Sequence, residues 1–200
     1  MKTLAITAFA AMALLVACDR RENDGNSTVG EAPDAAPQAA TAAETPAPAA
    51  APGEQANSGD VQALSLLAAI NQHEIDAARQ AVAKGVKGAV AEYAAMMEKD
   101  HGENQAKTLQ MITPVDTPDV ASMKADGAKE LQALDQQSSS AYEKAYIKAM
   151  VAGHQKALTA IDEKMLPAAQ SDPAKTHLTQ TRVHVAHHLE RAKAIEATQG

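Results

Sequence analysis

The 200-residue chain is poor in cysteine and in aromatic residues: it has one cysteine, one phenylalanine, three tyrosines and no tryptophan. A single cysteine excludes an internal disulfide. The chain also lacks an excess of positive charge, because 18 Lys and Arg stand against 25 Asp and Glu, for a formal net charge of −7. Nucleic-acid binding depends on clustered basic residues, so nucleic acid is not among the expected partners.

Two further patterns are missing. The sequence shows no nucleophile–base constellation and no glycine-rich loop of the kind that cradles phosphate, so enzymatic activity is the least favoured interpretation. No strand-like alternation of apolar and polar residues occurs after residue 59. The residues that are abundant there, Ala, Gln, Lys, Glu and Met, favour helices, so we predict an all-α domain.

The N-terminus carries a secretory signal followed by a lipidation motif. Residues 1–17 contain one early lysine and an apolar run from Leu4 to Val16, which is short for a membrane span. The ending Leu15-Val16-Ala17-Cys18 resembles a bacterial lipobox, in which the chain is cut before a cysteine that is then acylated, for example with palmitate. We therefore expect a lipoprotein anchored to a membrane of the cell envelope through Cys18 and facing the periplasm. The alternative is an ordinary cleaved signal with an incidental cysteine.

Which membrane holds the anchor is left open by the sequence. Asp19 follows the cysteine, and an aspartate at this place resembles the inner-membrane retention signal of enteric bacteria. Residues 18–59 consist mainly of Ala, Pro, Gly, Ser and acidic residues, with almost no branched apolar side chain. Such a composition cannot bury enough surface to offset the entropy of ordering, so we predict a disordered tether.

Residues 60–200 have the length of one domain, and their apolar spacing predicts four long helices. Gly85 is expected to end the first helix, and Thr117 to cap a short helix that opens with Pro118. Ser140 and Glu143 are expected to form a capping box for the third long helix, and Asp172 to cap the fourth. The predicted helices cover 60–84, 86–111, a short 118–134 that Gly127 is expected to interrupt, 140–167, and a last helix from 172. A long connection between the second and third long helices predicts a ferritin-like four-helix bundle with one crossover.

Polar residues interrupt the apolar stripes of these helices at one level. Glu74, His101, His154 and His188 each stand at a stripe position of a different long helix. Counting from the turns at about 1.5 Å per residue, His154 and His188 lie at nearly the same height, and Glu74 and His101 differ by roughly 7 Å. We therefore predict a mid-bundle cluster that binds a divalent transition metal through Glu74, His101, His154 and His188.

The donor set decides which metal is expected. A di-iron site needs four carboxylates and two Glu-x-x-His pairs, whereas this chain has one such pair, Glu98 and His101. A histidine-rich set favours zinc or copper. Two alternatives remain open: a buried Glu–His–Asn polar network without metal, and a copper role that uses the methionines, which are otherwise core residues.

Several neighbouring residues are weaker candidates for metal ligands. Glu98 is either a ligand or the solvated flank of its helix, and His184 could add a ligand because it is four residues from His188. His73, His177, His184 and His187 lie beside the apolar stripes, so we expect them at the surface or at its boundary.

The domain from residue 60 to about 197 resembles the bacterial domain-of-unknown-function 4142 (DUF4142) family of outer-membrane and periplasmic proteins, which is assigned to the ferritin-like bundles. The resemblance depends on Glu74-Ile75 and on residues 90–94, 97–101, 142–146, 154–158 and 188–192. Two positions depart from it, since Tyr142-Glu143 replaces a Phe-Asp pair and Val183 replaces a usual proline. The resemblance implies a fold and an envelope location, but no reaction.

Two functions therefore lead. The first is a metal-binding envelope lipoprotein, and the second is a structural or protein-interaction bundle with a buried polar network and no metal. The sequence names no protein partner, no physiological role and no oligomeric state.

Overall fold

The computed structural model describes residues 58–199, and this part of the chain is helical. The predicted signal peptide, the lipidated Cys18 and nearly all of the predicted tether lie outside the described residues, so they stay predictions. Among the described residues, no helix is both long enough and apolar enough to cross a bilayer.

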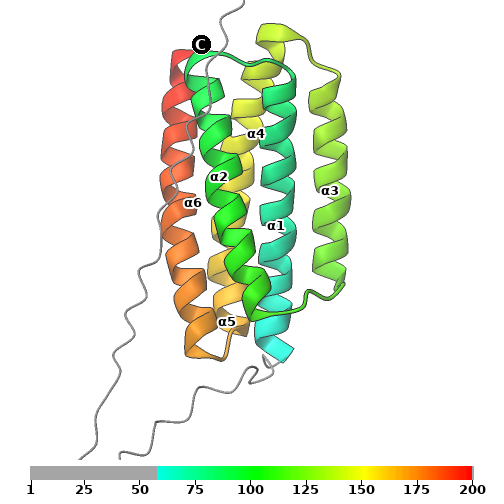
Figure 1. Ribbon diagram of the computed structural model, residues 1–200, viewed down its shortest axis with the longest axis vertical. Coiled ribbons are helices and arrows are strands. Elements are labelled where there is room, and N and C mark those ends of the chain that lie inside the picture. The colour runs from blue at the N-terminus through cyan, green and yellow to red at the C-terminus, as the bar shows by residue number, and fades with distance from the viewer. Residues whose placement is uncertain (1–57, 200) are drawn as a thin grey trace, which may run out of the picture. The chain divides into compact units, whose positions relative to one another are not determined.

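Four long helices and one outer helix make up the described domain (Figure 1). The third long helix begins as an α-helix, passes through a π-helical turn (η1) and ends in one short α-helical turn before Ala169. The elements are α1 (Ser58–Ala83), α2 (Gly88–Met111), α3 (Pro118–Asp135), α4 (Ser139–Ala160), η1 (Ile161–Met165), α5 (Leu166–Ala168) and α6 (Asp172–Thr198).

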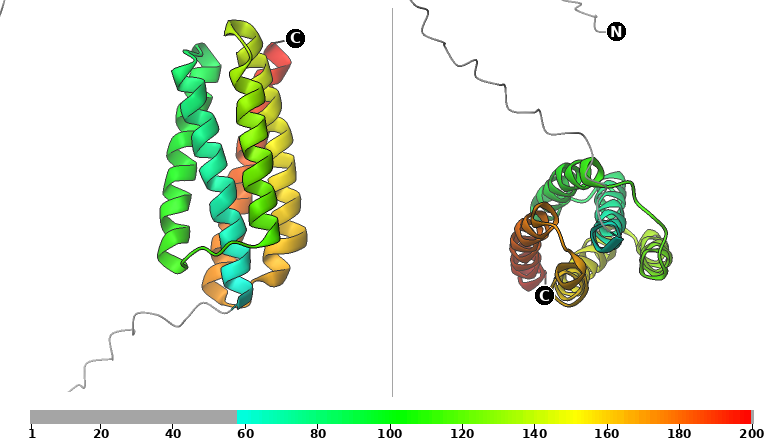
Figure 2. Two further views of the ribbon diagram at one scale, coloured as in Figure 1. Left: turned by 90° about the vertical axis from the view of Figure 1, so that its right-hand side faces the viewer. Right: turned by 90° about the horizontal axis from the view of Figure 1, so that it is seen from below.

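The long helices form two hairpins. One hairpin joins α1 to α2, and the other joins α4 to α6 (Figure 1). Seen from the end, α1, α2, α6 and α4 surround a common interior, while α3 lies outside this ring against α1 (Figure 2). The connection from α2 to α4 therefore runs the length of the bundle through α3, as the predicted crossover with a short helix requires. The all-α prediction is confirmed.

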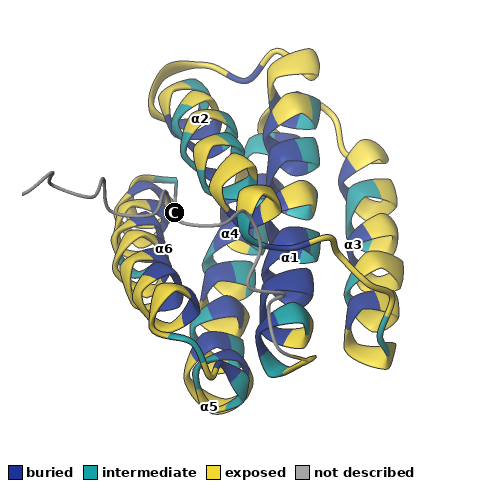
Figure 3. Ribbon diagram, turned by 60° about the horizontal axis from the view of Figure 1, so that its bottom comes forward, coloured by how far each residue is buried: buried dark blue, intermediate teal, exposed yellow. Residues whose placement is uncertain are grey.

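The buried side chains form two apolar clusters with a polar layer between them. Buried residues lie on the sides of the helices that face the interior of the bundle (Figure 3). One apolar cluster lies toward the α1–α2 turn and contains all three tyrosines with Met97 and Met150. A second lies toward the other end and contains Leu64, Met165 and Leu178. Between them every long helix places buried polar side chains, which are Asn71 and Glu74 on α1, His101 on α2, His154 on α4 and His188 on α6.

The sequence located most helix ends correctly. Gly85 follows α1 with a φ of +73°, a left-handed conformation that favours glycine, and Thr117 caps α3 by accepting a hydrogen bond from the N–H of Val120. The prediction for Gly127 is wrong, because α3 runs through it without a break. The second helix begins at Gly88, two residues later than expected.

Two predicted caps are also wrong. Ser140 and Glu143 do not form a capping box, because the Glu143 carboxylate accepts a hydrogen bond from the Lys87 N–H at 2.8 Å and so ties α4 to the α1–α2 turn. Ser171 rather than Asp172 caps α6, since its hydroxyl accepts from the N–H of Ala174. The Glu143 carboxylate therefore accepts from a donor far away in the sequence, and the cap of α6 lies one residue before the predicted one.

The start of α1 is fastened to the loop that precedes α6. Asp60 is buried, and its Oδ1 accepts hydrogen bonds from the backbone N–H groups of Gln170, at 2.7 Å, and Ser171, at 3.2 Å. Burial raises the pKa of this carboxyl, but the hydrogen bonds outweigh it and the pKa is lowered overall. The two hairpins are therefore joined at this end of the bundle by a charged group.

Candidate metal centre

Three histidines from three helices meet in the polar layer. The ring centroids of His101, His154 and His188 are 5.3–5.8 Å apart, and one ring nitrogen of each can be chosen so that the three lie within 4.8 Å of one another. All three side chains are buried. The sequence prediction that these histidines converge is thus reproduced by the structure.

One nitrogen of each ring is held by an acceptor. The Nδ1 of His154 lies 2.8 Å from the Met150 carbonyl oxygen, and the Nε2 of His188 lies 3.0 Å from Oδ2 of Asp100. Because a carbonyl or carboxylate oxygen only accepts, these nitrogens carry the proton. The Nδ1 of His101 lies 2.9 Å from Oδ1 of Asn71, an amide oxygen that also accepts.

The other nitrogen of each ring has no hydrogen-bond partner in residues 58–199. These atoms are Nε2 of His101, Nε2 of His154 and Nδ1 of His188, and all three are buried. With the proton on the opposite nitrogen, each presents a lone pair. A buried polar atom without a partner is costly, so three of them on neighbouring rings call for an explanation.

The surroundings keep the rings uncharged. Burial lowers the pKa of His154 to about 4, although the Met150 carbonyl opposes the change. The pKa of His101 is well below its ordinary value, because of burial and the proximity of the other two rings. Burial also lowers the pKa of His188 and outweighs the opposing hydrogen bond to Asp100. Neutral imidazole is the form that binds metals.

A chain of amide and hydroxyl groups fixes the orientation of His101. Asn71 donates from Nδ2 to Oδ1 of Asn104, at 2.8 Å, and Asn104 donates from its own Nδ2 to the Thr181 hydroxyl, also at 2.8 Å. The Thr181 hydroxyl in turn donates to the His177 carbonyl. The network determines which atom of Asn71 faces His101, and so supports the assignment of a protonated Nδ1.

Glu74 is buried in the same layer but does not join the three histidines. Its Oε1 lies 3.9 Å from Nδ1 of His154, the nitrogen already used by Met150, and its Oε2 has no hydrogen-bond partner in the described part of the chain. Burial raises its pKa to about 7. Glu74 therefore contacts the protonated side of His154, whereas the lone pair of that ring lies on the other nitrogen.

The two additional ligand candidates lie outside the group. Glu98 forms an ion pair with Arg79 at 2.8 Å, with its side chain 41% exposed, which corresponds to the solvated-flank interpretation. His184 is exposed. His187 is exposed and His73 is at the boundary, as expected, but the expectation for His177 is wrong: it is buried, and its Nε2 lies 2.9 Å from the Thr108 hydroxyl.

Asp100 and Asn71 contribute to the centre in a way that the sequence prediction missed. Asp100 points across to α6 and holds His188, although it precedes His101 and lies off the apolar stripe of α2. The adjacent Asp100-His101 pair is visible in the sequence, but whether Asp100 can reach His188 depends on how α2 and α6 pack against each other. Asn71 lies on α1 three residues before Glu74, and its side chain holds His101.

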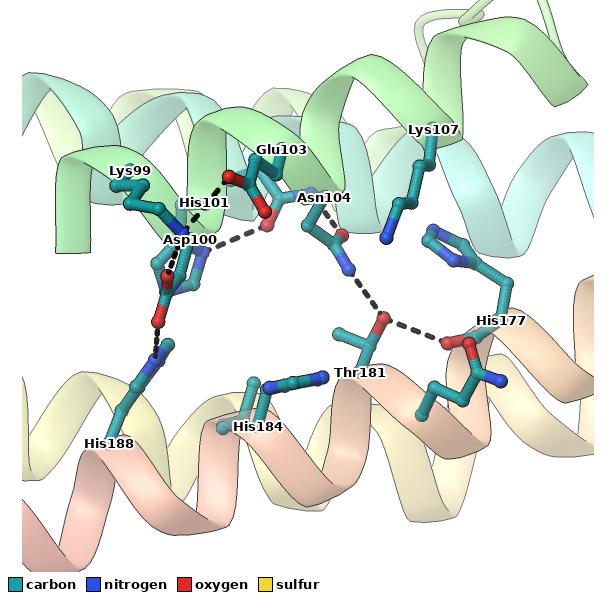
Figure 4. A pocket seen from close by; sticks show the side chains of 13 residues that line it. Lys99, Asp100, His101, Glu103, Asn104, Lys107, His177, Thr181, His184 and His188 are labelled. Atoms are coloured by element: carbon teal, nitrogen blue, oxygen red, sulfur yellow. Dashed lines mark hydrogen bonds and ion pairs between the residues drawn. The ribbon is translucent and has the colours of Figure 1, made fainter. Parts of the chain in front are cut away.

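A cavity of about 220 Å³ between α2 and α6 reaches the centre from one side (Figure 4). His101 and His188 line it, and His154 does not. The remaining lining is mostly polar and includes Lys99, Asp100, Asn104, Lys107 and His184. Two of the three rings thus border space that a small polar molecule can enter.

The comparisons with known proteins give a family but no function. No curated protein and no solved structure matches the chain. Residues 45–195 match a family described as a domain of unknown function, DUF4142. That match spans most of the chain and contains all three histidines, and the chain therefore belongs to the DUF4142 family.

Proposed function

We propose that this protein is an envelope lipoprotein whose helical bundle binds one divalent transition-metal ion through His101, His154 and His188. One observation carries the proposal: each ring has one nitrogen held by an acceptor and the other buried without a partner. Metal-binding histidines show this arrangement, because the acceptor fixes the tautomer and directs the free lone pair at the ion.

The donor set favours zinc or copper. Three neutral imidazoles and no carboxylate suit these ions better than a di-iron centre, and better than magnesium or calcium, which prefer oxygen ligands. Bonds of about 2.0–2.1 Å would place tetrahedral nitrogens roughly 3.4 Å apart. Nitrogens within 4.8 Å of one another therefore need to move inward by about 1 Å to bind a common ion.

The competing function is a structural or protein-interaction bundle with a buried polar network. The linked side chains of Asn71, Asn104 and Thr181 favour it, because they form part of such a network without any ion. That network does not extend to the three unpartnered ring nitrogens. Metal binding explains these atoms, and the polar network alone does not.

The test is metal binding to the purified chain after treatment with a chelator. We expect one zinc or copper ion per chain by elemental analysis, and a melting temperature that rises with added ion, because an ion at 100 times its Kd stabilises the folded state by about 2.7 kcal/mol. His101→Ala and His188→Ala should remove the rise. His187→Ala is the matched control, since His187 is an exposed histidine of the same helix as His188.

Each variant is compared with itself, with and without ion, so that a change in its intrinsic stability does not affect the result. Retention of the rise in both His→Ala variants would place the ion elsewhere. A wild-type chain that retains no ion and melts at the same temperature in zinc, in copper and in chelator would contradict metal binding and favour the structural bundle with a buried polar network.

The location is proposed from the sequence alone. The Leu-Val-Ala-Cys ending supports acylation of Cys18, with residues 19–59 as the spacer between membrane and domain. Cell fractionation tests it: Cys18→Ala should leave unprocessed or released protein, whereas the wild type should remain with membranes. Equal membrane retention of the two would contradict the lipid anchor.

A further inference from the structure

We infer that an ion at the three histidines takes its fourth ligand from outside the chain, and that this ligand is a small anion entering through the cavity between α2 and α6. The inference rests on the proposed metal binding and deepens it. It concerns the coordination position that the three rings leave open.

The described part of the chain supplies three ligands and no fourth within reach. Among residues 58–199, the group able to hold an ion consists of the three histidines alone. The nearest carboxylates are engaged or face another way: Asp100 accepts from Nε2 of His188, and Glu74 contacts the protonated side of His154. Zinc sites with three protein ligands keep their fourth position for water or a substrate, whereas structural sites fill it with protein.

Charge balance favours an anion at that position. Three neutral imidazoles leave the full double positive charge of the ion in a buried layer, where an uncompensated charge is costly. Asp100, whose carboxylate is hydrogen-bonded to His188, is shared with Lys99, whose Nζ lies 3.5 Å from its Oδ1. An incoming anion would therefore reduce the charge more directly than any side chain of the centre.

The cavity has the position and size for such a ligand. It is bordered by His101 and His188, while His154 lies outside its lining, so the cavity approaches the centre from the α2–α6 side (Figure 4). A water molecule occupies about 30 Å³ in the liquid, so a cavity of about 220 Å³ admits an anion of a few atoms together with water. The lining carries two lysines and two carboxylates, which are Lys99, Lys107, Asp100 and Glu103. Lys99 pairs with both carboxylates, at 3.5 Å and 3.0 Å, whereas Lys107 forms no ion pair within the described residues and remains available to an anion.

The experiment uses the full chain loaded with copper(II), with azide as the probe anion. Azide bound directly to copper(II) gives a charge-transfer absorption that neither component shows alone. We expect a saturable new band as azide is added. A variant with the cavity filled, His184→Trp, should keep its copper but need at least tenfold more azide for half-saturation. His187→Trp is the control, because His187 is equally exposed on α6 but does not line the cavity.

Each outcome has a separate meaning. Failure of the wild-type chain to hold copper would refute the proposed metal binding itself. Copper that stays bound with no azide band would refute the anion inference and leave metal binding intact. A copper spectrum already altered in His184→Trp before azide is added would make His184 the fourth ligand. Equal azide affinity in both Trp variants would show that the bound anion does not occupy this cavity.

Discussion

Replacing Glu74 with glutamine should stabilise the metal-free protein near neutral pH. Glu74 is 3% exposed and has no hydrogen-bond partner on Oε2 within the described residues, and burial raises the pKa of its carboxyl from 4.5 to about 7. A charged carboxylate here would be costly, so the folded protein holds the proton that the unfolded chain has already lost. Glutamine has almost the same shape and never ionises.

The sign and the size of the effect follow from linkage. Between about pH 4.5 and 7 the folded state binds the Glu74 proton and the unfolded state does not, so the wild-type free energy of unfolding falls as pH rises through this range. At 1.36 kcal/mol per pKa unit the loss amounts to about 3 kcal/mol at pH 7. Glu74→Gln should therefore be about 3 kcal/mol more stable than wild type at pH 7 and equal to it below about pH 4.5.

The contribution of His154 to stability has the opposite pH dependence. Its folded pKa is lowered to about 4, so its contribution is fully present above pH 6.5 and is lost, by about 3 kcal/mol, as pH falls toward 4. In the wild type the two groups nearly cancel between about pH 4.5 and 6.5. In Glu74→Gln the histidine effect is unmasked, and the free energy of unfolding should fall steeply on acidification.

Urea denaturation of both proteins in chelator, at half-unit steps from pH 4 to 8, measures these curves. Glu98→Gln, at an exposed glutamate, is the control and should remain within about 0.5 kcal/mol of wild type throughout. A difference between Glu74→Gln and wild type that is constant with pH would show that the Glu74 carboxyl titrates alike in the folded and unfolded states. Burial would then not raise its pKa, and the reasoning would be refuted.

Two further substitutions test the packing. Asp60→Ala should lower the free energy of unfolding by about 2–3 kcal/mol at pH 7 in urea denaturation, because two backbone N–H groups before α6 lose a charged acceptor. The difference from wild type should shrink as pH falls through the lowered pKa of Asp60. A difference that persists at low pH would contradict this. Gly127→Ala should destabilise the folded protein, because the added Cβ would lie 2.7 Å from Nδ1 of His73. Gly102→Ala has nothing within 4 Å of its added Cβ, so its free energy of unfolding should rise by about 0.5–1 kcal/mol. Thermal melts that show both variants stabilised would contradict the close contact of α3 with α1.

The helices could be predicted from the sequence because their signals are local. The apolar period and the punctuation at Gly85 and Thr117 act within a few residues, so neighbouring elements did not override them. The failed cap at Glu143 shows the limit. Its spacing from Ser140 satisfies the capping-box pattern, but the Lys87 N–H, brought close by the fold, takes the carboxylate.

The sequence predicts the height of each residue along its helix, and the candidate centre could be predicted to that extent. Counting residues from the turns placed His154 and His188 at one level, and the structure brings their rings to 5.6 Å. The same count, despite the difference of roughly 7 Å between Glu74 and His101, led to the prediction of Glu74 as a ligand, whereas Glu74 lies outside the group of three histidines. Rotation of each helix about its axis decides which ring nitrogen faces inward and whether Asp100 reaches His188, and no spacing within a single helix encodes that.

Because the bundle consists of two hairpins, an ion at the centre would connect one half of the domain to the other. His101 belongs to the α1–α2 hairpin, whereas His154 and His188 belong to the α4–α6 hairpin. An ion bound by all three would be a removable cross-link between halves of the domain, closing a loop that contains residues 102–153. Cross-links of this kind stabilise by restricting the unfolded chain. A chain with one cysteine has no internal disulfide for this purpose, so the stiffness of its bundle would follow the supply of metal rather than the redox state of its surroundings.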